Sequence, residues 1–373
     1  MNPFLTTHKF DLDERIKIAF FILSGIAPLK FIMFTIFALL TAITLYLSFI
    51  GYKKNEEISK IRRYFLYIPQ IFAYLTLLSL GYFNISENIN KFNKFNYLER
   101  KDAPKLIISN HVSFIDSLYF FTRGIPSIVT VPNVLKIPFA GFAIKKMEPI
   151  IVPTTKKEKK ELPNVKEQIT NRLMNTNLSS PLLIFPEGGT KNSNYLLKFQ
   201  NGAFMNNVTY QPILLKYKYK YLDPSWTLDS GTFKLIFLMC CQFINNLEVT
   251  YLEPCNLSKD DIRQVYISKL NVIDSNFSNH DNLFLRKNLD KMNYIFEHVY
   301  IKKYNIEYFN KKYNLNHEKM HDLVNEFYKC DEFKNGTIIT QDVNAIFNKL
   351  NLVKKSEIKE NIITFNQMIE SLV

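Results

Sequence analysis

A histidine and an aspartate stand five residues apart in the segment ISNHVSFIDSLYFF. His111 follows the apolar run Leu106–Ser109, which is typical of a buried strand, so we expect it at the C-terminal edge of that strand. On one continuous helix, a separation of five residues would place the two side chains about 140° apart. We therefore predict that His111 precedes a helix and that Asp116 lies in its first turns.

In that placement the carboxylate of Asp116 accepts a hydrogen bond from one ring nitrogen of His111 and leaves the other nitrogen able to take a proton. An imidazole with the ordinary pKa of about 6.5 is a competent base near neutral pH. The chain has six histidines, and His111 is the one that falls in the strand-bearing region. Taken by itself, the pair is also compatible with a capping histidine and a surface aspartate.

A second strand-like run, in the segment LLIFPEGGT, ends in Glu187. The glycines that follow, Gly188 and Gly189, allow the backbone to approach a ligand closely, and their N–H groups can bind a phosphate. Two strand ends would then bring Glu187 and the His111–Asp116 pair to one edge of a sheet. This convergence favours a catalytic site.

Short β-branched runs alternate with helical segments in the middle of the chain. The runs are Leu106–Ser109, Ser127–Val131, Pro149–Val152, Pro181–Phe185, Pro212–Lys216 and Leu247–Leu252. This alternation predicts an α/β domain over residues 98–256, with a central mixed sheet flanked by helices. Residues 257–373 are polar and helical in pattern, and we assign them to a separate tail.

Two long uncharged stretches precede the predicted domain. Residues 31–51 are long enough to cross a bilayer as a helix. Residues 64–83 form a second apolar stretch in which Pro69 indicates either a kinked span or a re-entrant hairpin. The shorter run Ile18–Leu29 suits the membrane interface. We therefore assign residues 1–97 to a membrane-anchoring region; burial of both stretches in a soluble protein is the alternative, which their lack of charge disfavours.

The excess of lysine and arginine gives a net charge of +13. Such a charge suits nucleic acid, an anionic membrane or a phosphate-bearing substrate. Because the apolar stretches indicate a membrane protein, we expect contact with membrane lipid and no nucleic-acid partner.

Four ordered motifs resemble the glycerolipid acyltransferase (PlsC-type) superfamily. SNHVSFIDSL carries the N-H-x-x-x-x-D pattern of that family and LIFPEGGT its F-P-E-G pattern, while NVLKIPFAGF and YQPILLKY resemble its second and fourth motifs. Segments such as KNSNYLLKFQNGAF and LMCCQFINNLEV are similar to the lysophosphatidylcholine acyltransferase-like branch. The resemblance extends over about residues 2–254.

The resemblance implies acyl transfer from acyl-CoA to the free hydroxyl of a lysophospholipid of the lysophosphatidylcholine type. His111 would deprotonate the hydroxyl and Asp116 would orient the ring, without an acyl-enzyme intermediate. It also implies an integral membrane protein of the endoplasmic reticulum that uses acyl-CoA as co-substrate and needs no metal or other cofactor. A 1-acylglycerol-3-phosphate acyltransferase is the near alternative.

The resemblance further implies that the acceptor and its phosphate are bound around the F-P-E-G motif. The candidate residues are Glu187, Gly188, Gly189, Thr190, Asn110 and Lys136. Two positions depart from the family pattern, because Gly189 stands in place of the usual threonine and Thr154 in place of a common arginine. We hypothesise that Lys136 or the lysines of residues 156–160 supply the missing phosphate contact.

Three other readings compete. HEKMH at residues 317–321 matches the H-E-x-x-H zinc motif and keeps a metalloprotease as a remote alternative, although a solvated helix face is expected. DEFKNGTIITQD at residues 331–342 resembles an EF-hand loop in which Phe333 occupies a ligand position and Asp342 replaces the bidentate glutamate, so we expect a degenerate calcium site. A non-catalytic membrane adaptor is the third, and the intact motifs disfavour it.

Overall fold

The computed structural model describes residues 2–53, 58–88, 104–175, 180–204, 208–300, 305–354, 356, 358 and 360–372. The chain divides into two compact units. The first is Phe4–Asp274, which contains every predicted site residue. The second joins Ser275–Val373 with Met1–Pro3.

A seven-stranded sheet forms the centre of the first unit, with the order β1-β8-β7-β2-β5-β3-β4. Its strands are β1 (Asn84–Asn88), β2 (Leu106–Ser109), β3 (Ser127–Thr130), β4 (Ile150–Ile151), β5 (Leu182–Ile184), β7 (Tyr210–Lys218) and β8 (Asn246–Tyr251). β7 and β8 run antiparallel and the other neighbours run parallel. The predicted central mixed sheet is confirmed.

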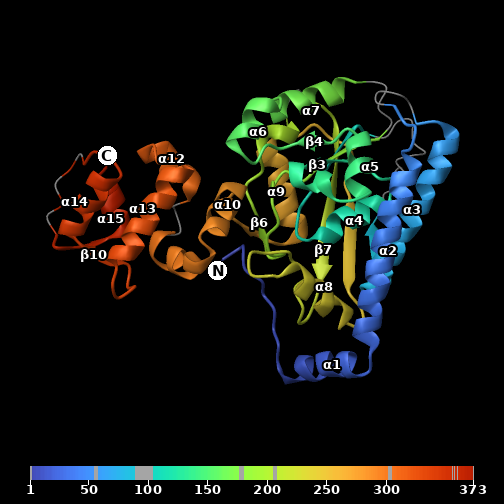
Figure 1. The fold of residues 1–373 in the computed structure, drawn as a ribbon, viewed down its shortest axis with the longest axis horizontal. Coiled ribbons are helices and arrows are strands. Elements are labelled where there is room, and N and C mark those ends of the chain that lie inside the picture. Colours follow the sequence, from blue (N-terminus) through green and yellow to red (C-terminus); the bar gives the residue numbers. More distant parts are fainter. Residues whose placement is uncertain are drawn as a thin grey trace. The chain divides into compact units, whose positions relative to one another are not determined.

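Helices cover both faces of this sheet (Figure 1). The sheet separates two hydrophobic cores, one on each face. Successive side chains of β2 point to opposite faces, so Ile107 packs in one core and its neighbours Leu106 and Ile108 pack in the other. The first face is covered by α3 (Lys60–Ser79), α4 (Phe114–Thr122) and α8 (Thr232–Cys240), and the second by α7 (Val165–Met174) and α9 (Lys259–Leu270). The smaller elements around the sheet are η1 (Pro132–Lys136), α5 (Ala140–Lys146), α6 (Lys156–Glu161), η2 (Asn201–Phe204) and the pair β6 (Tyr195–Leu196) and β9 (Ile273–Asp274).

The first unit continues past residue 256, where we predicted that the catalytic domain ends. Helix α9 buries Ile262, Tyr266 and Leu270 in the second core, and the hydroxyl of Tyr266 donates to the carbonyl of Ile108 at 2.9 Å. The division therefore falls after Asp274, and the first residues of the predicted tail belong to the sheet-bearing unit.

The N-terminal helices differ from the predicted apolar stretches in their bounds. Helix α2 (Ile26–Ser48) is long and apolar enough to cross a membrane, and it is the one such helix in the described parts of the chain. Helix α3, which lies beside α2 (Figure 1), is one continuous helix with Pro69 in its interior. It begins with charged residues and is less apolar than α2, so the second predicted stretch is not a further span candidate by length and composition. The run Ile18–Leu29 is divided between α1 (Leu12–Leu23) and α2, because Gly25 adopts a positive φ of 76°.

The second unit is helical, with one short strand pair. Its elements are α10 (Asn279–Lys287), η3 (Leu289–Lys291), α11 (Met292–Tyr294), η4 (Ile295–Val299), α12 (Ile306–Tyr313), α13 (His317–Cys330), β10 (Thr337–Ile339), α14 (Thr340–Lys349), β11 (Ile362–Thr364) and α15 (Phe365–Glu370). β10 and β11 pair antiparallel, and Phe327 packs edge-on against Phe365 at 5.1 Å between ring centroids. Because β10 directly precedes α14 and β11 directly precedes α15, this strand pair links the starts of the two helices.

The HEKMH segment forms the start of α13. The ring of His317 packs edge-on against Phe284, and burial lowers the pKa of this histidine. The ring of His321 does not share this environment, because its Nδ1 contacts the side-chain amide of Asn325. Among the described residues, no group of three or more His, Cys, Asp or Glu side chains is arranged to hold a metal ion.

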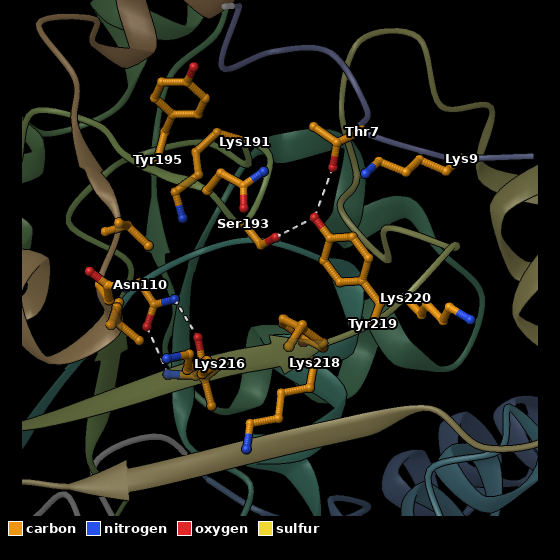
Figure 2. Close-up of a pocket in the computed structure, with 16 residues that line it drawn as sticks. Thr7, Lys9, Asn110, Lys191, Ser193, Tyr195, Lys216, Lys218, Tyr219 and Lys220 are labelled. Carbon is orange, nitrogen blue, oxygen red and sulfur yellow. Dashed lines mark hydrogen bonds between the residues drawn. The ribbon is translucent and has the colours of Figure 1, made fainter.

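A cavity of about 480 Å³ opens in the first unit beside the end of β7 (Figure 2). Its walls come from the N-terminal segment, the chain after β5, the last residues of β7 and the turn that follows α9. Asn110, next to the predicted base, is one of its lining residues.

Candidate active site

The turn between β2 and α4 carries the predicted catalytic pair. Strand β2 ends at Ser109, His111 lies in the turn, and Asp116 is the third residue of α4. The Nδ1 of His111 is 2.8 Å from Oδ2 of Asp116. This is the placement that the five-residue spacing predicts. With Nδ1 held by the carboxylate, Nε2 is the ring nitrogen that can take a proton.

The carboxylate of Asp116 is fully buried and held by several donors. Its Oδ2 accepts the backbone N–H groups of Val112 at 2.6 Å and Ser113 at 2.9 Å, in addition to the His111 contact. Its Oδ1 accepts the hydroxyl of Tyr217. A carboxylate in the first turn of a helix is also stabilised by the N-terminal helix dipole. Asp116 therefore holds one orientation and fixes the imidazole beside it.

The ring of His111 is held from a second side by Phe185. The two rings stack with their centroids 4.0 Å apart and their planes 9° apart. The His111 side chain is 19% exposed, so it is accessible at one edge while the stacked face and Nδ1 are covered. The ring of His111 is thus held in one orientation on two sides.

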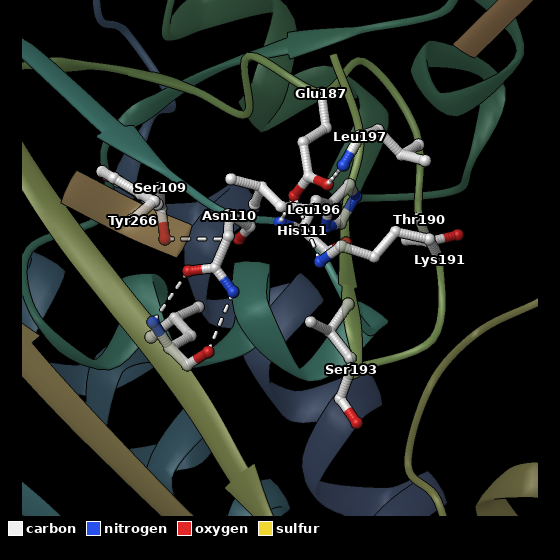
Figure 3. Close-up of polar contacts among 12 residues, drawn as sticks. Ser109, Asn110, His111, Glu187, Thr190, Lys191, Ser193, Leu196, Leu197 and Tyr266 are labelled. Carbon is white, nitrogen blue, oxygen red and sulfur yellow. Dashed lines mark hydrogen bonds and ion pairs between the residues drawn. The ribbon is translucent and has the colours of Figure 1, made fainter. Parts of the chain in front are cut away.

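Glu187 lies beside the same turn and is fully buried (Figure 3). Its Oε1 accepts the backbone N–H of His111 at 2.8 Å, and its Oε2 accepts that of Leu197 at 2.9 Å. The Nζ of Lys191 lies 3.2 Å from Oε1 of Glu187 and 3.4 Å from the carbonyl of His111. Both oxygens of Glu187 are thus engaged within the protein. This geometry fits a residue that positions His111 better than one that contacts the acceptor.

The other predicted acceptor residues occupy different environments. Asn110 is buried, and its side-chain amide bonds both the N–H and the carbonyl of Leu215, which ties β2 to β7. Gly188 is exposed with a φ of 77°, which makes the sharp turn after Glu187. The hydroxyl of Thr190 donates to the carbonyl of Trp226.

The last two candidates are Gly189 and Lys136. Gly189 is half-buried in the turn that Gly188 begins. Lys136 is exposed on η1, where its Nζ lies 3.3 Å from Oδ1 of Asn133. The structure therefore brings Asn110, Asp116 and Glu187 around His111, and leaves the glycine turn as the exposed candidate beside them.

Sequence reasoning missed Lys191 and Tyr217 as site residues. Lys191 stands four residues after Glu187, and this spacing is compatible with an ion pair. The spacing does not show that the pair is buried, because burial depends on how the chain folds. Tyr217 lies in the YQPILLKY motif at the end of β7, on the same strand face as Ile213 and Leu215. Burial and the neighbouring charge of Asp116 raise the pKa of Tyr217 well above its ordinary value, so its hydroxyl stays a donor.

Replacing Tyr217 with phenylalanine is expected to lower kcat about tenfold, because a buried carboxylate oxygen of Asp116 loses its hydrogen bond. Since the raised pKa keeps Tyr217 protonated, the ratio of wild-type to variant kcat should stay constant between about pH 7 and 9. The matched control is Tyr82→Phe, whose hydroxyl is buried without a hydrogen-bond partner among the described residues. Equal kcat values in both variants would contradict the assigned role.

Part of the chain is similar to a protein family and to several acyltransferases. Residues 83–216 match the family model described as Acyltransferase. The lysophospholipid acyltransferase LPEAT1 of Arabidopsis thaliana is 36% identical over 169 residues, 44% of this chain and 42% of that protein. The lysophosphatidylcholine acyltransferase of Drosophila melanogaster is 32% identical over 217 residues, 53% of this chain and 40% of that protein. The chain therefore spans less than half the length of either relative.

The fold also resembles a solved structure. The 1-acyl-sn-glycerophosphate (LPA) acyltransferase PlsC from Thermotoga maritima aligns with a TM-score of 0.45 and 13% identity, over 69% of this chain and 94% of that chain. The family model and the relatives, without this structure, confirm the resemblance to the lysophosphatidylcholine acyltransferase-like branch of the glycerolipid acyltransferases.

Proposed function

We propose that the protein transfers an acyl chain from acyl-CoA to the free hydroxyl of a lysophospholipid, because residues 83–216 match the family model described as Acyltransferase. The observation that carries the proposal is the contact of Nδ1 of His111 with the buried carboxylate of Asp116, at an accessible turn. The names of the relatives favour a lysophospholipid acceptor of the lysophosphatidylcholine type. A 1-acylglycerol-3-phosphate acyltransferase is the second candidate, since the acceptors share a glycerophosphate.

In the proposed reaction, Nε2 of His111 takes the proton of the acceptor hydroxyl while the oxygen attacks the thioester carbonyl carbon. The C–S bond then breaks, and the CoA thiolate leaves with the proton returned by the imidazolium. The charge of Asp116 stabilises that imidazolium, and no acyl-enzyme forms. We assign the acceptor phosphate to the turn at Gly188 and Gly189, with Lys136 and the lysines of residues 156–160 as further candidate contacts. The N–H of Gly188 already donates to the carbonyl of Phe185 at 2.9 Å, so the N–H of Gly189 is the donor that we assign to the phosphate.

The test is an acceptor panel with the purified full chain, one acyl-CoA donor, and lysophospholipids that carry choline, ethanolamine or no headgroup. We expect the highest kcat/KM with a choline or ethanolamine headgroup. A preference for lysophosphatidate would select the second candidate, and an absence of transfer to every acceptor would reject the proposal.

We further propose α2 as an anchor in the endoplasmic reticulum membrane, so the protein should stay with that membrane fraction after alkaline carbonate extraction.

For the second unit we propose a degenerate EF-hand-like pair with poor calcium affinity. The Asp331 carboxylate accepts the N–H groups of Asn335 at 3.1 Å and Gly336 at 2.7 Å, and also the hydroxyl of Tyr294. Phe333, at a position that requires an oxygen ligand, is 85% exposed. Calorimetric titration of the full chain should show no binding at micromolar calcium. A micromolar dissociation constant would refute this proposal.

A further inference from the structure

The cavity beside the end of β7 collects basic side chains from separate parts of the chain (Figure 2). None of the described lining residues is Asp or Glu, while five are lysines. The lysines are Lys9, Lys191, Lys216, Lys218 and Lys220. Hydroxyl and amide side chains, including those of Thr7, Ser193 and Asn271, complete the wall. A cavity lined in this way attracts anions and offers them hydrogen-bond donors.

The walls of the cavity are joined to one another by hydrogen bonds. The hydroxyl of Tyr219 contacts that of Thr7 at 2.8 Å and accepts the hydroxyl of Ser193 at 3.0 Å. The backbone N–H of Lys9 donates to the carbonyl of Tyr221 at 3.1 Å. Three segments that are distant in the sequence are thus held together before any ligand binds, which lowers the entropic cost of binding.

The same cavity borders the catalytic turn. Lys191 and Tyr217 line it, and these two residues contact the carbonyl of His111 and the carboxylate of Asp116 respectively. Its volume of about 480 Å³ lies within the range of roughly 300–1,000 Å³ that is typical of pockets for whole small ligands. The cavity therefore offers more room than a single phosphate group needs.

We propose that this cavity binds the phosphorylated nucleotide part of the CoA donor. Lys191 pairs with Glu187 and Lys218 with Glu248, so the other three lysines supply positive charge beyond these pairs. The nucleotide part of CoA carries several phosphate charges, which this excess matches. The phosphodiester of a lysophosphatidylcholine carries one negative charge, already balanced by its choline. The inference rests on the proposed use of acyl-CoA.

The test replaces Lys9 and Lys216 with glutamine, singly and together. Both side chains are at least partly exposed, so the variants should unfold at the wild-type temperature. The probes are CoA and adenosine 3′,5′-bisphosphate, titrated calorimetrically into the full chain. We expect the double variant to raise both Kd values and the KM for acyl-CoA by about tenfold or more, with the KM for the lysophospholipid unchanged. Lys166→Gln on α7, exposed and outside the cavity, is the charge-matched control.

Each other outcome has a distinct meaning. A raised KM for the lysophospholipid with unchanged Kd for CoA would assign the cavity to the acceptor phosphate and overturn the inference. Unchanged constants for both substrates in the folded double variant would overturn it as well. If the wild-type chain binds CoA through these lysines but transfers no acyl group, the proposed function fails while the assignment of the cavity stands.

Discussion

Acyl transfer should fall by a factor of about 10² to 10⁴ when His111 is replaced by alanine, because this is the contribution that a positioned general base makes. The remaining groups of the site cannot replace it, since Asp116 is fully buried and already bonded to two backbone N–H groups and to Tyr217. The measurement is kcat/KM with radiolabelled acyl-CoA and lysophosphatidylcholine, on membranes that contain matched amounts of protein.

The control for this variant is His321→Ala, in the HEKMH segment of α13, which should retain wild-type activity. It separates the acyltransferase from the metalloprotease alternative, in which loss of His321 and metal chelation would abolish activity. Equal background rates for wild type and His111→Ala would instead support the non-catalytic adaptor.

Replacing Lys191 with methionine is expected to destabilise the first unit by about 3–5 kcal/mol, the usual cost of leaving one charge of a buried pair without its partner. Lys191 is 1% exposed and Glu187 is fully buried, so solvent cannot replace the lost contact. This cost is a large part of the roughly 5–15 kcal/mol by which native proteins are stable. Since Glu187 binds the backbone N–H of His111, kcat should fall together with stability.

A double-mutant cycle makes this prediction specific. Glu187→Gln combined with Lys191→Met removes both charges. The free energy of unfolding of this double variant should therefore fall by less than the sum of the decreases in the two single variants. Urea or thermal unfolding measures the free energies, and Lys166→Met on the exposed face of α7 provides the control. If Lys191→Met unfolds no more easily than this control, the buried pair does not have the strength assigned to it.

The fold of the acyltransferase region could largely be anticipated, because its signals are local. The predicted β-branched runs match the strands β2, β3, β4, β5, β7 and β8, since each strand buries its own apolar side chains whatever its partner. Helix α2 overlaps the predicted apolar stretch of residues 31–51, although it begins earlier, at Ile26, and includes Lys30. The end of the unit could not be anticipated in the same way. The charged surface of α9 resembles a separate tail, while its few buried residues complete the second core.

The sequence by itself determined the turn that holds His111 and Asp116, because the two residues are close enough along the chain for one strand end and one helix start to join them. The tertiary structure decided the rest of the site. Tyr217 reaches Asp116 across 101 positions through the strand order, and Lys191 is buried because neighbouring segments cover it. Spacing along a chain encodes local geometry, whereas burial and contacts between distant segments depend on how the strands and helices pack.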